Sequence, residues 1–245
     1  MSGLNTSSHT TAGTLAAVKE ATSVLTGVVD GFSESDFPRP SLLPGWTRGH
    51  VVTHLARNAD ALVNLLTWAR TGIEHAAYPS RADRDAAIHA GATRLGQVQR
   101  EDLIAASGRF LVEARRLTDA DWAAPVQHPH GELIPAVEIP QRRLFEVWTH
   151  LVDLDAGFGF DAVPADHLDL MLDRAVHPIL SRTGGTPVRL RVDLPDGRQR
   201  SWEFAIGTQD GGTELSGSAA AALAWLTGRG PVELDGTPPE LAAWG

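Results

Sequence analysis

Glu146 and His150 are the two residues whose types and spacing most directly suggest chemistry. They lie four positions apart in a stretch whose apolar residues, including Leu144, Val147 and Leu151, recur every three or four positions, a period that predicts a helix. Residues four apart project from the same helical face, about one turn apart. A carboxylate and an imidazole placed in this way can fill two positions of a metal shell if another helix supplies a third ligand. The alternative is a solvent-exposed pair that stabilises the helix by about 0.3 kcal/mol.

His54 is the histidine best placed to complete such a set. It lies beside the apolar face of a second predicted helix, over residues 48–70, where a histidine is otherwise a hydrogen-bonded boundary residue. Two facing helices of a bundle can both point side chains inward. His54, Glu146 and His150 would then form a set that suits Zn²⁺ and leaves one coordination position open. Fe(II) and Ni²⁺ accept the same donors, and Asp153 is a candidate to hold His150 from outside the metal shell.

Other residues offer competing sites. His50 lies four positions before His54, so these two could form a metal pair of their own or add a fourth ligand. His128 and His130 lie in a loop and are a weaker alternative. The sequence has neither the Gly-x-Ser-x-Gly elbow of a serine nucleophile nor a phosphate-binding loop. Cysteine is absent, so thiol chemistry would need a thiol from a separate molecule.

Two arginines are candidates to hold a small carboxylate substrate. Arg84 follows the segment Tyr78-Pro79-Ser80 at the start of the third predicted helix, and Arg229 follows a predicted helix near the C-terminus. A guanidinium binds a carboxylate through two parallel hydrogen bonds. The alternative for either residue is a solvated surface arginine.

The composition excludes several classes of partner. Hydrophobic residues make up 42% and charged residues 21% of the 245 positions, as in an ordinary globular protein. With a net charge of −9 and no basic run, we expect neither a nucleic acid nor an anionic membrane as a partner. No apolar run approaches the roughly 18 residues of a membrane span, and the polar N-terminus does not have the pattern of a signal peptide. These observations predict a cytoplasmic protein.

Periodicity predicts the elements that must position these residues. Four helices are expected in the N-terminal part, over about residues 14–32, 48–70, 81–117 and 140–155. Gly91, Gly96 and Gly108 are candidate positions for a bend or an interruption of the third. Thr11 or Thr14 is predicted to cap the first helix, and Thr47 the second. A turn-rich segment over 33–46 and an irregular, Pro-rich segment over 118–139 provide the connections. This order predicts a four-helix bundle with one long connection.

A change of composition at residues 155–160 predicts a linker, so we expect domains over residues 1–157 and 158–245. The second domain has a predicted helix over 166–181, followed by strands over 188–194 and 202–206 joined by an Asp196-Gly197 turn. A further strand near 212–215, a helix from Ser218 to Leu226 and a short helix within 238–244 complete it. The predicted fold class is therefore a four-helix bundle followed by a small α+β domain.

Three segments resemble the mycothiol-dependent maleylpyruvate isomerases, a family of the DinB-like metalloprotein superfamily. Residues 44–58, PGWTRGHVVTHLARN, are similar to its first metal-binding motif. Residues 134–154, which contain Arg143, Glu146, His150 and Asp153 in the family spacing, are similar to its second motif. Residues 223–229, LAWLTGR, are similar to the end of its second domain, which resembles a sterol-carrier-like fold.

The resemblance implies a site and a reaction. It selects His54, Glu146 and His150 as ligands of Zn²⁺ or another divalent metal, and mycothiol, the low-molecular-weight thiol of actinobacteria, as the cofactor. The implied reaction is the cis-to-trans isomerisation of 3-maleylpyruvate to 3-fumarylpyruvate, which follows ring opening of gentisate in aromatic catabolism. The thiolate would add to the double bond, allow rotation and then leave. Arg84 and Arg229 are the candidates to hold the dicarboxylate substrate.

Two other functions fit the same residues. A mycothiol S-transferase would keep the metal and the thiol but join the thiol to other electrophiles. A non-enzymatic binding module would use the metal only for stability, with a fourth protein ligand such as His50 closing the shell.

Overall fold

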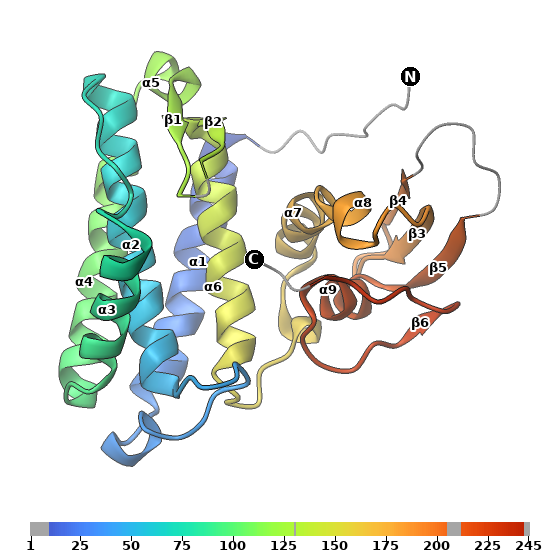
Figure 1. Ribbon diagram of the computed structural model, residues 1–245, viewed down its shortest axis with the longest axis horizontal. Coiled ribbons are helices and arrows are strands. Elements are labelled where there is room, and N and C mark those ends of the chain that lie inside the picture. The colour runs from blue at the N-terminus through green and yellow to red at the C-terminus, as the bar shows by residue number, and fades with distance from the viewer. Residues whose placement is uncertain (1–9, 130, 205–211, 243–245) are drawn as a thin grey trace. The chain divides into compact units, whose positions relative to one another are not determined.

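The computed structural model describes residues 10–129, 131–204 and 212–242. Its backbone separates into two compact units, one formed by Thr10–Ala156 and the other beginning at Gly157. The first unit consists of helices and one small hairpin, whereas the second combines helices with a four-stranded sheet (Figure 1). The chain is therefore a mixed protein of helices and sheet.

Four long helices form the body of the first unit and pack side by side (Figure 1). They are α1 (Thr11–Asp30), α2 (Arg48–Thr71), α4 (Gly96–Ala114) and α6 (Ile139–Asp153). Each helix turns a stripe of apolar residues inward, so that Leu25, Leu65, Phe110 and Leu144 are fully buried. A shorter helix, α3 (Arg81–Ala92), packs against α2. Removal of these stripes from water is the main force that holds the helices together.

Threonine side chains fix where the first two long helices begin. Thr10, rather than the predicted Thr11 or Thr14, caps α1, because its Oγ1 accepts from the N–H of Gly13 at 3.1 Å. Thr47 caps α2 as predicted, with Oγ1 accepting from the N–H of His50 at 3.3 Å. Several threonines precede the apolar stripe of α1, and periodicity does not indicate which of them leaves the helical conformation.

The segment before α2 ties the start of that helix to the end of α6. It contains the 3-10 helix η1 (Glu34–Asp36), and further along the N–H of Leu42 donates to the carbonyl of Asp153 at 2.9 Å. The buried guanidinium of Arg48 donates from Nε to the carbonyl of Leu154 at 2.7 Å, and from Nη2 to that of Asp155. A cation at the C-terminus of a helix satisfies its last carbonyls. The two helices therefore run antiparallel, with the first turns of α2 facing the last turns of α6.

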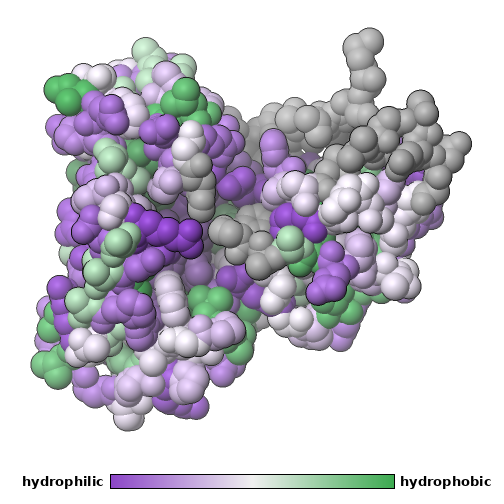
Figure 2. Space-filling view, viewed as in Figure 1, coloured by the Kyte–Doolittle hydropathy of each residue, from purple (hydrophilic) through white to green (hydrophobic). Residues whose placement is uncertain are grey.

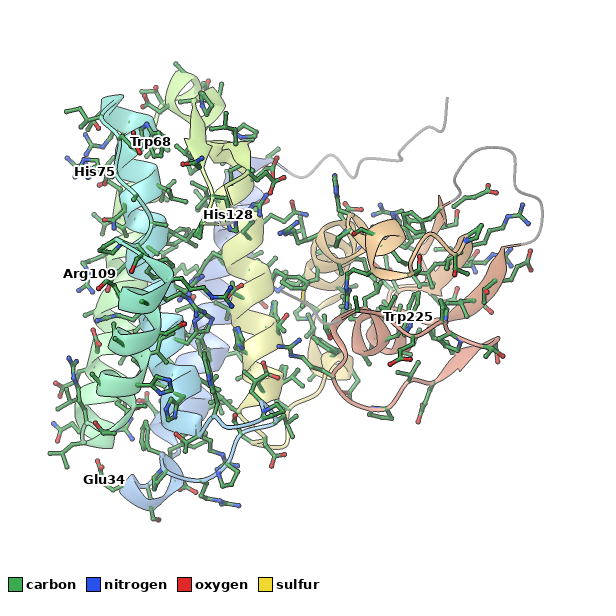
Figure 3. The ribbon with its side chains drawn as sticks, viewed as in Figure 1. Glu34, Trp68, His75, Arg109, His128 and Trp225 are labelled. Carbon is green, nitrogen blue, oxygen red and sulfur yellow. The ribbon has the colours of Figure 1, made fainter. Side chains whose placement is uncertain are left out.

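The structure divides the helix predicted over residues 81–117 into two, α3 and α4. They are separated at residues 93–95, directly before Gly96, one of the three glycines expected to bend or interrupt that helix. Glu34 lies beside the start of α4 (Figure 3), where its carboxylate accepts from the N–H groups of Gly96 and Gln97 at 2.7 and 3.0 Å. A Cβ at Gly96 would lie 2.3 Å from the ring of Phe37. Both partners come from far earlier in the chain, so the local pattern could not show which of the three glycines marks the break.

The connection predicted to be irregular contains ordered elements. They are the helix α5 (Asp119–Ala123), the strands β1 (Pro125–Gln127) and β2 (Leu133–Pro135), and the 3-10 helix η2 (Ala136–Glu138). The two strands pair antiparallel, with Val126 opposite Ile134 and both side chains buried. Strands of three residues are too short to show alternation in the sequence. The Pro140 expected at the start of the following helix does lie in the first turn of α6.

The sheet of the second unit has the strand order β4-β3-β5-β6. Its strands are β3 (Val188–Asp193), β4 (Gln199–Phe204), β5 (Thr213–Ser218) and β6 (Leu234–Asp235). The predicted hairpin joins β3 to β4 and places Leu190 opposite Trp202, whereas β5 lies parallel to β3. Strand β6 was not predicted from the sequence, and the end of the predicted second strand, residues 205–206, lies outside the described residues.

Four helical segments accompany this sheet: η3 (Phe160–Ala162), α7 (Ala165–Val176), α8 (Ile179–Arg182) and α9 (Ala219–Thr227). Ser218 caps α9 as predicted, accepting from the N–H of Ala221 at 3.1 Å, and α9 carries the buried Trp225 (Figure 3). The helix predicted over 166–181 is divided before α8, where Pro178 has no N–H for a helical hydrogen bond. The helix predicted within 238–244 is wrong over residues 238–242, which are not helical, and 243–244 lie outside the described residues.

Hydrophilic side chains cover most of the face of the first unit drawn in Figure 2, and apolar residues appear there as separate spots. Exposed apolar residues of this unit include Leu95, Val112 and Leu133. None of the helices in the described part of the chain is both long and apolar enough to cross a membrane.

Candidate metal centre

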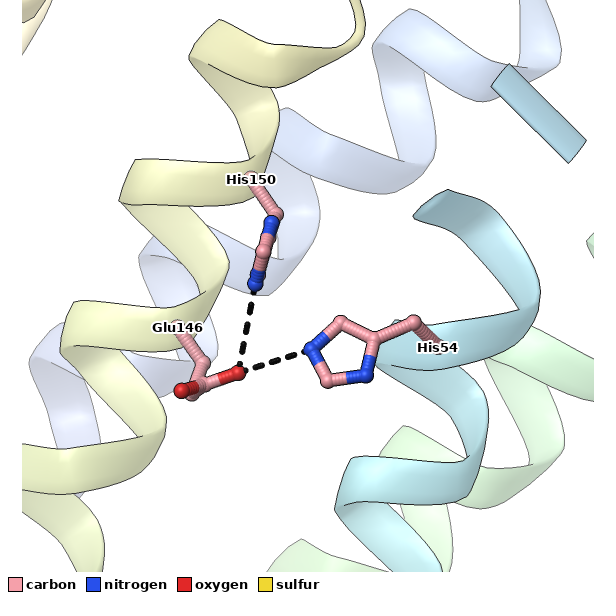
Figure 4. Close-up of side chains that lie close together, drawn as sticks. All are labelled: His54, Glu146 and His150. Atoms are coloured by element: carbon pink, nitrogen blue, oxygen red, sulfur yellow. Dashed lines mark hydrogen bonds and ion pairs between the residues drawn. The ribbon is translucent and has the colours of Figure 1, made fainter. Parts of the chain in front are cut away.

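The antiparallel contact of α2 and α6 brings the three predicted ligands together (Figure 4). His54 Nε2 lies 2.9 Å from Glu146 Oε2, and His150 Nε2 lies 3.4 Å from the same oxygen. The two imidazole rings meet edge to face with centroids 4.5 Å apart. One ligand atom from each residue lies within 4.8 Å of the others, although His54 and Glu146 are 92 positions apart in the chain.

Asp153 orients His150 from outside the cluster. Its buried carboxylate accepts from Nδ1 of His150 at 2.8 Å. This bond holds a proton on Nδ1 and directs Nε2 towards Glu146, so that Nε2 would be the nitrogen that gives up its proton to bind a cation. A supporting carboxylate of this kind is common behind a metal-binding histidine. The supporting role predicted for Asp153 therefore has a matching contact.

His54 has a different outer partner. Nη2 of Arg84 lies 3.2 Å from His54 Nδ1, and a guanidinium can only donate. Nδ1 therefore accepts, and the proton on Nε2 is donated to Glu146. Coordination through Nε2 would move that proton to Nδ1, where it would face the N–H of Arg84. The guanidinium would then have to withdraw from His54.

The environment sets the protonation states of the three side chains. Burial, together with the neighbouring His150 and Arg84, lowers the pKa of His54 to about 4 against the opposing effect of Glu146. Burial acts to raise the pKa of Glu146, but hydrogen bonds from His150 and His54 outweigh it and hold the pKa well below its ordinary value. Burial opposes protonation of His150, but the two carboxylates raise its pKa. Near neutral pH His54 is neutral and Glu146 ionised.

These residues fit a divalent cation. Two imidazoles and one carboxylate are ordinary ligands of Zn²⁺ and of several first-row metals. His54 is 4% exposed, and Trp46 covers it edge to face at a centroid distance of 5.6 Å. A bound cation would take the place of the hydrogen bonds that now join the two imidazoles to Glu146 Oε2. The three side chains already lie together, so no further residue would have to move in to bind it.

The competing histidines have other contacts. Nδ1 of His50 accepts from the backbone N–H of Thr47 at 3.2 Å, and its Nε2 lies 3.0 Å from Nδ1 of His89. Both ring nitrogens are thus directed away from the triad. His128 lies on the β1–β2 hairpin (Figure 3), and His130 is outside the described residues.

Arg143 is a feature that the sequence analysis did not assign to the site. It is fully buried on α6, one turn before Glu146. Its Nη1 donates to the carbonyl of Leu55 at 2.9 Å and to Oδ1 of Asn58 at 2.8 Å, and Nη2 donates to Oγ of Ser107 at 3.3 Å. Burial lowers its pKa to about 10, so it remains a cation. The sequence held one signal of this role: an arginine at a position that faces inward on a predicted helix with an apolar face.

Of the two candidate substrate arginines, Arg84 lies at the triad and Arg229 belongs to the second unit. Gly228, with φ 69°, ends α9, and the N–H of Arg229 donates back to the carbonyl of Ala224 at 2.9 Å. Its Nη1 donates to the carbonyl of Thr227 at 2.7 Å, while Arg182 donates to the adjacent carbonyl of Leu226 at 2.5 Å. Two guanidinium groups therefore share the C-terminal end of α9.

Comparisons with known proteins agree on one family. The profile described as the mycothiol maleylpyruvate isomerase N-terminal domain matches residues 18–155. Two similar solved structures are the crystal structures of a mycothiol-dependent maleylpyruvate isomerase and of its histidine-to-alanine mutant. Each is 29% identical to this chain and covers 96% of it and 98% of its own length, with TM-scores of 0.84 and 0.83 respectively. No curated protein sequence matches. The chain belongs to the mycothiol maleylpyruvate isomerase family.

Proposed function

We propose that the protein is a mycothiol-dependent isomerase that converts 3-maleylpyruvate to 3-fumarylpyruvate, a cis-to-trans change in the gentisate route of aromatic degradation. The observation that carries this proposal is the meeting of the ligand atoms of His54, Glu146 and His150 within 4.8 Å of one another, with His54 buried and the other two partly exposed. Membership of the family and the likeness over nearly the whole chain support it. The expected location is the cytoplasm.

His54, Glu146 and His150 are the residues that would hold the cation, with Zn²⁺ as the first candidate. A divalent cation in this position supplies a Lewis acid that lowers the pKa of a thiol. The protein contributes an ionised carboxylate, a neutral His54 and an oriented His150. The site is also partly screened from water, which strengthens each electrostatic interaction within it.

Mycothiol, when bound, supplies the nucleophilic thiol that the reaction needs. The chain has no cysteine, so its own residues offer no competing thiol and form no disulfide with the cofactor. The chain's role is to hold the substrate while its double bond loses and regains double-bond character. That role requires positive charge for the two carboxylates.

Arg84 is the proposed partner of one substrate carboxylate. It lies against the triad through His54 and has a further hydrogen bond to Asp85 at 2.7 Å. If coordination of His54 displaces its guanidinium, the freed donors become available to an anion. Arg229 is the proposed partner of the second carboxylate, supported by the resemblance of residues 223–229 to the family.

We also propose that the first unit is a DinB-like four-helix bundle and the second a sterol-carrier-like domain, with the boundary between residues 157 and 158. The packing of the four long helices of the first unit supports the former. The four-stranded sheet with α7 and α9 supports the latter.

One assay tests the function. The purified protein is analysed for bound metal, and the loss of maleylpyruvate is followed with and without mycothiol. We expect turnover that depends on both the metal and the thiol. Turnover that is unchanged without mycothiol contradicts the proposal, and conjugation of mycothiol to a general electrophile without isomerisation favours an S-transferase instead.

A further inference from the structure

Tyr78 is the only tyrosine of the chain, and the structure holds it beside the candidate metal centre. It lies in the loop between α2 and α3. The side-chain amide of Asn64 on α2 donates to the carbonyls of Ala76 and Ala77, both at 3.3 Å. These bonds fix the backbone just before Tyr78, and Ala77 is buried. The phenol is thus positioned by a built loop and is not a free surface group.

The phenol lies near charged residues of the site. The guanidinium carbon of Arg84 lies 5.9 Å from the centre of the Tyr78 ring, within the range of a cation–π contact. The same guanidinium reaches His54 Nδ1 at 3.2 Å, so Arg84 joins the tyrosine to the triad. Burial raises the pKa of Tyr78, and Glu146 adds to this while Arg84 and Arg143 oppose it. The hydroxyl therefore stays protonated at neutral pH and can donate.

The reaction needs a donor of this kind. As the carbon–carbon double bond of a maleylpyruvate loses its double-bond character, electron density moves onto the conjugated keto oxygen, and it returns when the double bond forms again. A neutral hydroxyl aimed at that oxygen stabilises the charge as it develops. Unlike another arginine, a neutral hydroxyl adds no positive charge next to the metal ligands.

We propose that the hydroxyl of Tyr78 donates a hydrogen bond to the keto oxygen of the substrate and stabilises the negative charge that develops there. The inference rests on the proposed function, and it assigns Tyr78 a catalytic role while Arg84 and Arg229 hold the carboxylates. The proton stays on the phenol oxygen throughout, so the step involves no net proton transfer.

Tyr78→Phe tests the role because it keeps the ring and removes only the hydroxyl. Loss of one oxyanion donor lowers kcat by roughly 100-fold in other enzymes. We expect kcat with mycothiol to fall by about 10- to 100-fold, with KM changed by less than about 2-fold and the bound metal unchanged. A kcat within about 2-fold of the wild type overturns the proposal.

Thr71→Val is the matched control. It also removes one hydroxyl, next to the same loop, where Thr71 Oγ1 donates to the carbonyl of Thr67 at 2.8 Å. We expect its kcat to equal that of the wild type. A fall as large as that of Tyr78→Phe would mean that the loop responds to any lost hydroxyl, and would overturn the assignment.

A second measurement does not depend on turnover. Biosynthetic replacement of tyrosine by fluorotyrosine places a single fluorine label in the protein, because the chain has one tyrosine. We expect fumarylpyruvate, which carries the same keto oxygen, to shift that one fluorine resonance in the metal-loaded protein, and an unshifted resonance overturns the proposal. A shift without any turnover by the wild type would reject the isomerase function but keep the contact. Normal turnover without a shift would reject only the role of Tyr78.

Discussion

The two histidines of the candidate centre have opposite outer partners. His150 donates to the carboxylate of Asp153 at 2.8 Å, whereas His54 accepts from the guanidinium of Arg84 at 3.2 Å. A carboxylate makes its imidazole a stronger ligand, and a guanidinium competes with coordination. At the residue scale, these two contacts should therefore affect metal affinity in opposite directions.

Asp153→Asn should weaken metal binding. The amide cannot supply the negative charge that holds the Nδ1 proton of His150, and loss of such a partner typically costs about 10- to 100-fold in affinity. Competition with a chromophoric chelator measures the change. Asp30→Asn, which alters a surface ion pair with Arg100, is the control and should leave the affinity unchanged. An equal affinity for Asp153→Asn and the wild type would contradict the supporting role.

Arg84→Met should have the opposite effect and strengthen metal binding by about 10-fold. The change removes a donor that faces the nitrogen at which coordinated His54 must carry its proton, and it removes a nearby positive charge. The same chelator competition provides the measurement. Arg84→Lys keeps the charge and should lie between the two proteins. Weaker binding by Arg84→Met would show that the guanidinium supports the ligand.

At the scale of elements, close packing between helices depends on small residues at particular positions. Gly91 on α3 faces α2, and a Cβ there would lie 2.4 Å from the Thr53 side chain. Gly108 on α4 has open space, with no atom within 4 Å of the position of a Cβ. We therefore expect substitution by alanine to change the free energy of unfolding in opposite directions at these two glycines.

Gly91→Ala should lower the free energy of unfolding by about 1–3 kcal/mol, because the added methyl group forces α3 away from α2. Gly108→Ala should raise it by about 0.5–1 kcal/mol, because alanine is the better helix former where packing is not disturbed. Urea denaturation of both variants measures the difference. Equal stability of Gly91→Ala and Gly108→Ala would contradict the close packing of α3 on α2 at Gly91.

Asp36 closes the 3-10 helix η1 before α2, and its contribution to stability should depend on pH. Hydrogen bonds from the side chain and backbone of Ser33, together with Arg39, lower the pKa of this carboxyl from 3.8 to about 2. A carboxyl with a depressed pKa stabilises the fold above its unfolded pKa, and this effect is lost as the pH falls through its folded pKa. The stabilisation is therefore complete near neutral pH and disappears between about pH 4 and pH 2.

Asp36→Asn makes this dependence measurable. The urea midpoint of the variant should lie below that of the wild type at neutral pH, and the gap should close as the pH falls to about 2. A gap that is independent of pH would mean that the carboxylate charge is not what stabilises η1.

For the molecule as a whole, the proposed metal ligands belong to one unit and the proposed substrate-binding Arg229 belongs to the other. All three candidate ligands lie within Thr10–Ala156, whereas Arg229 follows Gly157. Arg229→Gln should therefore leave the metal content unchanged and lower kcat/KM for maleylpyruvate by about 10- to 100-fold, the value of a charge-assisted bond to a carboxylate. Metal analysis and kinetics on the same preparation separate the two effects. Loss of metal from this variant would contradict the division.

The sequence by itself indicated the elements with long, regular patterns. The apolar period predicted the helices that became α1, α2 and α6, and alternation with the Asp196-Gly197 turn predicted the β3–β4 hairpin. The helical spacing of Glu146 and His150 placed both on one face. These features depend on neighbours within a few residues, so they can be read locally.

Features that depend on contacts between distant residues became known from the tertiary structure alone. The choice of Gly96, among the three candidate glycines, as the place of the break between α3 and α4 depends on Glu34 and Phe37. The burial of Arg143 depends on acceptors from α2 and α4, and β5 joins β3 in parallel. The meeting of His54 with Glu146 depends on the antiparallel contact of α2 and α6, which Arg48 secures. The sequence named the candidate ligands and Asp153, which lies three positions after His150 on the same helix. The distances between the ligands, the contact of Arg84 with His54 and the position of Tyr78 follow from packing between elements far apart in the chain, which no local period encodes.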